Sequence, residues 1–229
     1  MAHPRFGDIS VCVFDAYGTL FDYNSAAARH SAALGDKAAP LADLWRLKQL
    51  QYTWLRSLMG RYAGFWQVTG EALDFSLGEL GIEDEALRAN LMEAYLSLDA
   101  YPEVTGMLET LRAHGLRTAI LSNGEPGMLD AAVEAAGLAD LLDAVLSVEE
   151  VGIFKPHPSV YQLVVDRLGV AAANVSFQSS NAWDANGAAA FGFRVAWCNR
   201  FGQGQERVPD APDAEIATLA ELPALLGIA

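Results

Sequence analysis

Residues 10–19 read Ser-Val-Cys-Val-Phe-Asp-Ala-Tyr-Gly-Thr, an apolar run that ends at an aspartate and a turn-prone segment. The run is short and partly β-branched, which is typical of a buried strand, and the glycine that follows favours a turn. The stretch therefore predicts a strand in the core that carries Asp15 at its carboxyl end.

After residue 101 the chain alternates between strand-like and helix-like segments. This alternation predicts a parallel sheet with helices on both faces, and in open sheets of this kind ligands bind beyond the carboxyl ends of the strands. Four predicted strands are followed by polar residues, which we expect to meet in one crevice: Asp15, Ser122-Asn123-Gly124, Lys155 and Ser179-Ser180-Asn181. After the strand that ends at Phe14, the predicted strands lie at 117–122, 143–147, 175–179 and 194–198, and the helices at 104–115, 128–137, 159–169 and 182–192.

Between about residues 26 and 98 the pattern changes to apolar residues that recur three and four positions apart. This period is typical of helices, and nothing in the stretch indicates a strand. We therefore divide the chain into a core domain, residues 1–24 and 99–229, and an inserted helical cap, residues 25–98. The cap is expected to cover the crevice. The only loose loop is expected at residues 202–212.

The composition excludes several classes of function. The formal net charge of −14 disfavours nucleic acid and anionic membranes as partners, because both require a basic surface. No apolar run approaches the roughly 20 residues that span a bilayer, and the N-terminus lacks the pattern of a signal peptide. Cys12 and Cys198 lie in apolar runs and form no disulfide framework. We expect a soluble cytoplasmic protein.

Several motifs, taken in their order along the chain, resemble the haloacid dehalogenase superfamily and, within it, the (S)-2-haloacid dehalogenases. The resemblance covers nearly the whole chain. It implies an α/β fold with a Rossmann-like parallel sheet and a helical cap, and hydrolysis of short L-2-haloacids to 2-hydroxy acids with inversion. The motifs are Phe14-Asp-Ala-Tyr-Gly-Thr-Leu-Phe-Asp, Leu44-Trp-Arg-Leu-Lys-Gln-Leu-Gln-Tyr-Thr-Trp-Leu-Arg, Leu121-Ser-Asn-Gly, Phe154-Lys-Pro, Ser179-Ser-Asn-Ala-Trp-Asp and Gly192-Phe-Arg-Val-Ala-Trp-Cys-Asn-Arg.

The resemblance assigns the role of nucleophile to Asp15. A carboxylate can displace halide from a saturated carbon to form an ester, which water then hydrolyses. Taken alone, an aspartate after a strand is usually a turn cap, and only the other motifs in register favour catalysis. Thr19 is placed to orient the carboxylate, although a simple turn hydroxyl is the alternative.

Three charged residues complete the reaction that the resemblance implies. Lys155 would keep Asp15 ionised, since an opposite charge nearby favours the carboxylate form. Asp184 would guide the water that hydrolyses the ester, and Arg46 would receive the departing halide in a dry site. Each has an ordinary alternative. Lys155 could be a solvated surface lysine, Asp184 an acid that is favourable early in a helix, and Arg46 an arginine that extends its charged end to solvent.

The remaining site residues follow from the resemblance as well. Supporting catalytic polar residues are Ser122, Tyr161, Ser179 and Asn181. Residues expected to contact the substrate are Tyr17, Arg46, Leu47, Leu50, Phe65, Ser122, Asn123, Lys155, Asn181 and Trp183. Leu47 stands where relatives often have Gln, and Gln178 where they have an apolar residue, so both departures leave the substrate and halide preference open. Core packing is the ordinary interpretation for Leu50, Phe65 and Trp183.

Tyr17 bears on the main alternative, a small-molecule phosphatase of the same superfamily. Those phosphatases resemble this chain but carry a second aspartate two residues after the nucleophile. That aspartate acts as the general acid that protonates the leaving alcohol. A halide leaves as a stable anion and needs no proton, so a tyrosine is compatible with dehalogenation. The late pair of acids that holds Mg²⁺ in the phosphatases is also missing, so we expect no metal and no cofactor.

A non-catalytic binding protein on the same fold is the third interpretation, because fold alone never establishes function. The presence of Asp15, Lys155 and Asp184 together disfavours it. The expected partners are a small 2-haloacid and the halide ion, together with a second copy of the chain in a homodimer. The sequence leaves open whether fluoride is displaced from fluoroacetate.

Overall fold

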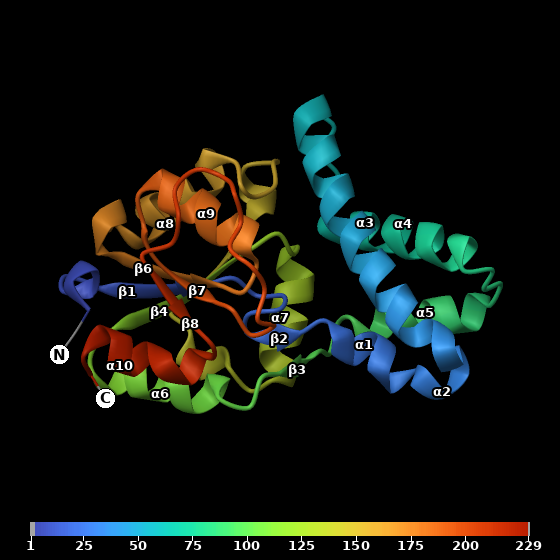
Figure 1. Cartoon of the computed structure of the whole chain (residues 1–229), viewed down its shortest axis with the longest axis horizontal. Helices are drawn as coiled ribbons and strands as arrows, with labels where there is room; N and C mark the ends of the chain where they lie inside the picture. The colour runs from blue at the N-terminus through green and yellow to red at the C-terminus, as the bar shows by residue number, and fades with distance from the viewer. Residues whose placement is uncertain (1–2, 229) are drawn as a thin grey trace.

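A computed structural model describes residues 3–228 of the chain. Its centre is a six-stranded sheet in the order β5-β4-β1-β6-β7-β8, and every neighbouring pair of strands is parallel (Figure 1). The strands are β1 Val11–Phe14, β4 Arg117–Ser122, β5 Ala144–Ser147, β6 Val175–Ser179, β7 Arg194–Cys198 and β8 Ala214–Ile216.

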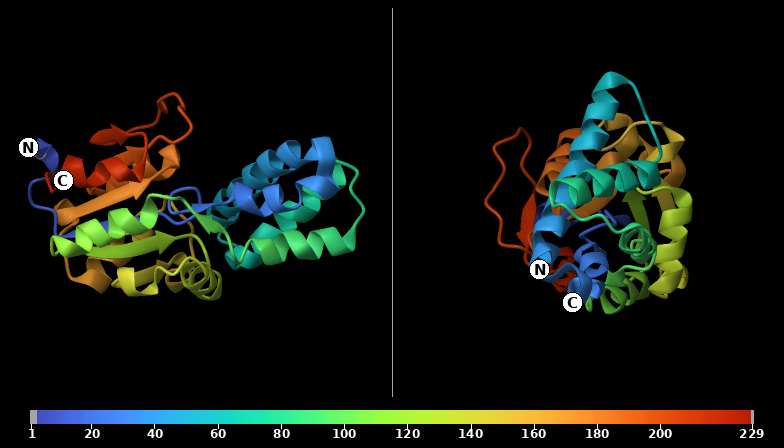
Figure 2. Two further views of the ribbon diagram at one scale, coloured as in Figure 1. Left: turned by 90° about the horizontal axis from the view of Figure 1, so that it is seen from below. Right: turned by 90° about the vertical axis from the view of Figure 1, so that its right-hand side faces the viewer.

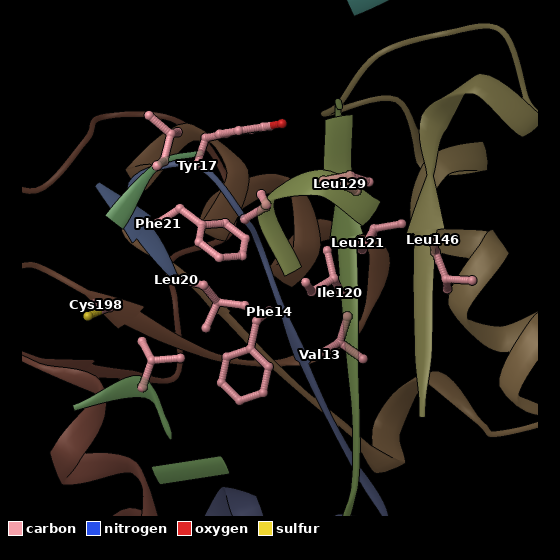
Figure 3. Packing of buried hydrophobic residues seen from close by; sticks show 14 of the residues in the cluster. Val13, Phe14, Tyr17, Leu20, Phe21, Ile120, Leu121, Leu129, Leu146 and Cys198 are labelled. Carbon is pink, nitrogen blue, oxygen red and sulfur yellow. The ribbon is translucent and has the colours of Figure 1, made fainter. Parts of the chain in front are cut away.

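Helices cover both faces of this sheet. On one side lie α6 (Val104–Ala113) and α10 (Leu222–Leu226), and on the other lie α8 (Pro158–Leu168) and α9 (Ala182–Phe191) (Figure 1). Helix α7 (Pro126–Ala135) packs beside β5. Because helices cover both faces of the sheet, all four residues of β1 are buried. A strand that is buried on both faces has apolar residues in succession instead of in alternation. Figure 3 shows Val13 and Phe14 of β1 beside Ile120 and Leu121 of β4 in this core.

The helices α1–α5 form a separate group beyond the carboxyl end of β1 (Figure 2, left). It connects to the sheet through a two-stranded antiparallel ribbon of β2 (Phe21–Asp22) and β3 (Asp99–Ala100). The N- and C-terminal segments lie side by side at the opposite end, where the His3 N–H donates to the Leu225 carbonyl at 3.0 Å. The five helices are α1 Asn24–Arg29, α2 Ser31–Leu34, α3 Ala38–Met59, α4 Phe65–Glu79 and α5 Glu85–Ala94.

This architecture confirms the predicted α/β class with a helical cap region. Each of the five strands expected from the sequence is present within one residue of its predicted bounds. Strands β2, β3 and β8 were not predicted, since two or three residues are too few to show a period. Residues 202–212 contain neither helix nor strand. Within residues 3–228, none of the helices combines the length and apolar character that a bilayer crossing requires.

Candidate active site

The carboxylate of Asp15 lies at the carboxyl end of β1 and is held on both oxygens. Lys155 Nζ lies 3.0 Å from Oδ1, while Oδ2 accepts from Asn181 Nδ2 at 2.8 Å and from Thr19 Oγ1 at 3.1 Å. Ser179 Oγ is at the limit of hydrogen bonding from Oδ2, at 3.5 Å. Asp15 is 6% exposed, so these groups replace the water that would otherwise surround the charge. The surroundings of the carboxylate are therefore preorganised.

The hydroxyl of Thr19 has its hydrogen free for Asp15. Its oxygen already accepts from the backbone N–H of Ser180 at 2.8 Å, and the Ser180 hydroxyl donates to the Gly18 carbonyl. Gly18 has a φ of +90°, a backbone conformation that residues other than glycine rarely adopt. The turn after β1 thus requires glycine, and it fixes the threonine beneath the carboxylate.

Lys155 is 1% exposed and bridges two carboxylates. Its Nζ donates to Asp15 at 3.0 Å and to Asp184 Oδ2 at 2.8 Å. Burial by itself disfavours the ammonium, but the two carboxylates outweigh it, so the pKa of Lys155 lies above its ordinary value. The lysine is therefore charged at neutral pH, and it is a fixed cation between two acids.

Asp184, near the start of α9, is completely buried. Burial raises the pKa of its carboxyl; the Lys155 charge opposes this rise and the Asp15 charge adds to it. Its Oδ1 accepts from the hydroxyl of Tyr161 at 2.8 Å. Burial raises the pKa of Tyr161 well above its usual range, so the phenol keeps its proton and acts as the donor. A Cβ at Gly187 would lie only 2.6 Å from the Tyr161 oxygen, so glycine there permits the contact.

Arg46 reaches the site from α3, in the helical region. Its Nη2 donates to Asn181 Oδ1 at 3.1 Å, and Asn181 in turn donates to Asp15. Its Nη1 donates to Gln49 Oε1 at 2.8 Å, and its guanidinium lies 4.8 Å from the centre of the Tyr23 ring. A single carboxamide thus separates the cation of the cap region from the carboxylate of the core.

Gln49 fixes Arg46 from behind. It is 1% exposed, and its Nε2 donates to Thr69 Oγ1 at 2.8 Å and to Tyr95 Oη at 3.1 Å. Sequence reasoning assigned Gln49 no role. The signal that could have identified it is its position three residues after Arg46, which places both side chains on one face of the helix.

Aromatic rings form the wall beside these polar groups. The ring of Tyr17 stacks on Phe65 with centroids 5.7 Å apart and packs against Tyr95 at 5.3 Å. Burial raises the pKa of Tyr17 well above its usual range, which keeps the phenol neutral. A Cβ at Gly124 would lie 2.9 Å from the Tyr17 ring, so the loop after β4 also contacts this wall.

Ser122 and Asn123 are buried, but the contacts that they make lie within the loops. Ser122 Oγ accepts from the Gly124 N–H at 3.0 Å, and Asn123 Oδ1 accepts from the backbone N–H of Lys155 at 3.0 Å. Asn123 therefore ties the loop after β4 to the segment that carries the lysine. Neither residue contacts Asp15 through these bonds.

Three of the residues expected to contact the substrate lie outside this hydrogen-bonded group. Leu47 is 58% exposed and lies on a different face of α3 from Arg46 and Gln49. Leu50 is half-buried, and Trp183 packs edge-on against Trp54 with ring centroids 5.4 Å apart. Gln178 is fully buried below the site, where its carbonyl accepts from the Asp15 N–H at 2.9 Å.

Comparison with known proteins identifies the family. Residues 9–192 match the haloacid dehalogenase-like hydrolases, and the chain is 49% identical over 219 residues to (S)-2-haloacid dehalogenase 1 of Pseudomonas sp. (strain CBS-3), covering 95% of this chain and 96% of that one. The chain belongs to the (S)-2-haloacid dehalogenases. This finding confirms the family and the enzyme class predicted from the sequence motifs.

Two further members of this dehalogenase family agree in sequence and structure. (S)-2-haloacid dehalogenase 4A of Burkholderia cepacia is 46% identical, with 95% of both chains covered. The structure of the Xanthobacter autotrophicus L-2-haloacid dehalogenase with chloropropionic acid covalently bound superposes with a TM-score of 0.90, at 43% identity over 96% of this chain and 98% of that one. The fold described above is therefore that of an L-2-haloacid dehalogenase over nearly the whole chain.

One contact between the helical region and the core had no signal in the sequence. The carboxylate of Glu125, in the loop before α7, accepts from the backbone N–H of Trp66 at 2.9 Å, at the start of α4. A negative charge at a helix N-terminus is favourable and satisfies a donor that the helix leaves free. A Cβ at Gly64 would overlap this carboxylate. The pair thus connects the two parts of this dehalogenase beside Phe65.

Proposed function

We propose that the protein hydrolyses short L-2-haloacids, such as haloacetates and 2-halopropionates, to 2-hydroxy acids with inversion at C2. The observation that carries the proposal is the Asp15 carboxylate, held between Lys155 and Asn181, with Arg46 bonded to the far side of that asparagine. This arrangement brings a nucleophile, its counter-ion and a cation for the leaving group together in one site. The names of the related dehalogenases support the substrate class.

The first step is displacement of halide by Asp15. An oxygen of the carboxylate forms a bond to C2 from the side opposite the halogen, and the halide leaves with the electrons of the broken bond. Oδ2 is engaged by two close donors, so Oδ1, which contacts Lys155 alone, keeps more lone-pair capacity for the attack. Arg46 receives the developing halide charge in the desolvated site.

The second step is hydrolysis of the aspartyl ester. Asp184 takes a proton from water as the water oxygen bonds to the Asp15 carbonyl carbon. The bond between that carbon and the C2 oxygen then breaks, and the C2 oxygen takes the proton from Asp184 to become the hydroxyl of the product. The raised pKa of the buried Asp184 carboxyl favours this role, since a base is most effective when its pKa approaches the working pH. Tyr161 holds that carboxylate in place.

The remaining predicted residues are proposed to shape and orient the substrate. The loop of Ser122 and Asn123 offers backbone N–H groups to its carboxylate, and Tyr17, Phe65 and Trp183 form apolar walls. Leu47 is not included, because its side chain faces solvent.

We propose that the reaction needs no metal. Lys155 Nζ lies 3.0 Å and 2.8 Å from the two acids, and so provides the positive charge that two neighbouring carboxylates require. Tyr17 also stands where a phosphatase of this superfamily has its acid. The alternative, a phosphatase, would depend on Mg²⁺.

Halide release tests the proposal. We expect chloride from L-2-chloropropionate with EDTA present, none from the D enantiomer, and none from Asp15→Asn. Asp130→Asn, which changes an exposed aspartate on α7, is the matched control and should keep full activity. Phosphate release from p-nitrophenyl phosphate that depends on Mg²⁺, without halide release, would support the phosphatase instead.

Fluoroacetate extends the same assay. Fluoride is the poorest leaving group among the halides and the best hydrogen-bond acceptor, so its displacement depends most on the donors that Arg46 provides. We propose that fluoroacetate is hydrolysed more slowly than chloroacetate. A rate of fluoride release no higher than that of Asp15→Asn would limit the substrates to the heavier halides.

The partners and location follow from the same reasoning. We propose a cytoplasmic homodimer with residues 25–98 acting as a cap on a core of residues 1–24 and 99–229. Apolar side chains of Leu55, Leu58 and Met59 exposed on α3 support the dimer. Cys12 and Cys198 lie on β1 and β7, which β6 separates, too far apart for a disulfide. Light scattering that gives a monomer mass would exclude the dimer.

A further inference from the structure

Arg200 closes one of the motifs that suggested the family, yet the reaction described above gives it no role. It follows β7 by two residues, and its side chain is only 9% exposed. Its Nη2 donates to the backbone carbonyl of Thr19 at 2.9 Å, its Nη1 lies 2.5 Å from Glu103 Oε1, and its guanidinium lies 3.9 Å from the centre of the Tyr101 ring. An arginine whose side chain is largely enclosed and has three separate partners has a specific place in the fold.

These partners belong to two different segments. Thr19 lies in the turn after β1, while Tyr101 and Glu103 lie where the chain returns from the helical region to the core. The two segments also contact each other directly, since the Tyr101 N–H donates to the Leu20 carbonyl at 3.0 Å. Arg200 therefore joins the nucleophile turn, the returning segment and the end of the sheet.

The contact with Thr19 leads to the nucleophile. Arg200 binds the carbonyl of Thr19, and the hydroxyl of the same residue donates to Asp15 Oδ2. A shift of this turn would move the hydroxyl and so change the orientation of the carboxylate. Misplacement of a reacting group by about 1 Å can lower a rate by about 100-fold.

We propose that Arg200 is a positioning residue, which holds the Thr19 turn and the segment of Tyr101 and Glu103 as one unit and thereby orients Asp15 for attack. The inference rests on the proposed function for its kinetic part. It depends on the planar guanidinium, because one group must donate to the Thr19 carbonyl, pair with the Glu103 carboxylate and lie over the Tyr101 ring. A lysine can satisfy only part of this arrangement.

The kinetic test uses Arg200→Ala and Arg200→Lys. We expect Arg200→Ala to lower kcat by about 10- to 100-fold with a much smaller change in KM, since the orientation of the nucleophile affects the chemical step. Added guanidinium chloride, below denaturing concentration, should restore part of kcat, while the same concentration of sodium chloride should not. Arg200→Lys, which can pair with Glu103 only as a point charge, should fall between wild type and Arg200→Ala.

Arg117→Ala is the matched control. Arg117 is half-buried and its Nη1 donates to the Leu168 carbonyl at 2.9 Å, but it lies at the amino end of β4, away from Asp15. It should lose stability without losing kcat. A loss of kcat that is equal in Arg117→Ala and Arg200→Ala, or that guanidinium does not reduce, would overturn the proposal.

Hydrogen exchange tests the inference independently of activity. In Arg200→Ala, the amides of residues 16–22 and 98–103 should exchange faster than in wild type, and guanidinium should slow them again. Arg117→Ala should leave these segments unchanged. Unchanged exchange in Arg200→Ala would overturn the positioning role, even in an active enzyme. Faster exchange in a protein that releases no halide would support the role and refute only the proposed function.

Discussion

Tyr161 donates its hydroxyl to Oδ1 of Asp184 at 2.8 Å, on the side of the carboxylate opposite to the oxygen that binds Lys155. Both oxygens of the buried acid are therefore occupied by donors that remain protonated at neutral pH. This arrangement fixes the ionisation of Asp184 as well as its position, so the pH dependence of the reaction reports on it.

Replacement of Tyr161 by Phe should move the acid limb of the kcat profile to higher pH. The tyrosine donates to the ionised form of Asp184 and so lowers a pKa that burial raises; without the donor the pKa of Asp184 rises further. More of the base is then protonated at a given pH. The measurement is kcat for L-2-chloropropionate across the acid range, compared with wild type. A limb that stays in place, or moves to lower pH, would show that Asp184 is not the base.

Replacement of Lys155 by Met should abolish turnover and destabilise the fold. It leaves two buried acids without their shared cation, and loss of one partner from a buried ion pair costs about 3–5 kcal/mol. Burial already raises the pKa of the Asp184 carboxyl, and without the opposing Lys155 charge this pKa in the folded state should exceed the value in the unfolded chain by more. The loss should therefore be present at neutral pH and decrease as the pH falls and Asp184 takes up a proton. Urea unfolding at neutral and acid pH measures this. An equal loss of stability at both values would contradict it.

Leu47→Gln should leave kcat/KM for L-2-chloropropionate within about twofold of wild type, because substitutions of exposed side chains have small effects. The residue is 58% exposed, on the face of α3 opposite to Gln49. Steady-state kinetics with the chloro, bromo and fluoro substrates tests this. A change in halide preference would mean that Leu47 faces the site when substrate binds.

The strand ends of the sheet were predictable because their geometry follows from the order of the strands. In a parallel sheet the carboxyl ends meet at one edge, so Asp15, Lys155 and Asn181 could be expected together from the alternation of helices and strands. Asp184 was expected from the motif at residues 179–184, and Tyr161 from the resemblance to the family. The structure adds the bond between them, which no spacing in the sequence predicts.

The helical region was predictable as a class but not in its contacts. Its apolar period indicates helices, yet the period does not say which polar residue on a helix faces the core and which faces solvent. Leu47 and Gln49 illustrate this, since the apolar residue is exposed and the amide is fully buried. The interactions of Arg200 and Glu125 join segments far apart in the chain, and only the folded structure brings them together.

The pair Gly64 and Glu125 allows a test of how the helical region is fastened to the core. Gly64 has a φ of −58°, a conformation that alanine adopts freely, so Gly64→Ala introduces no backbone strain. Its Cβ would instead displace the Glu125 carboxylate from the Trp66 N–H. We expect Gly64→Ala and Glu125→Ala each to cost about 1 kcal/mol of unfolding free energy, as for the loss of a helix cap.

The double variant distinguishes this explanation from independent effects. If both substitutions act by breaking the same contact, Gly64→Ala in the Glu125→Ala background should cost nothing further, whereas unrelated effects would add. Each single variant should also raise KM more than it lowers kcat, because Phe65 follows directly in α4 and forms part of the proposed substrate wall. Urea unfolding and steady-state kinetics on the four proteins measure both quantities. Additive losses in stability would show that Glu125 does not fasten α4, and the placement of Phe65 would then be attributed to its packing, which includes aromatic contacts with Tyr17 and Phe154.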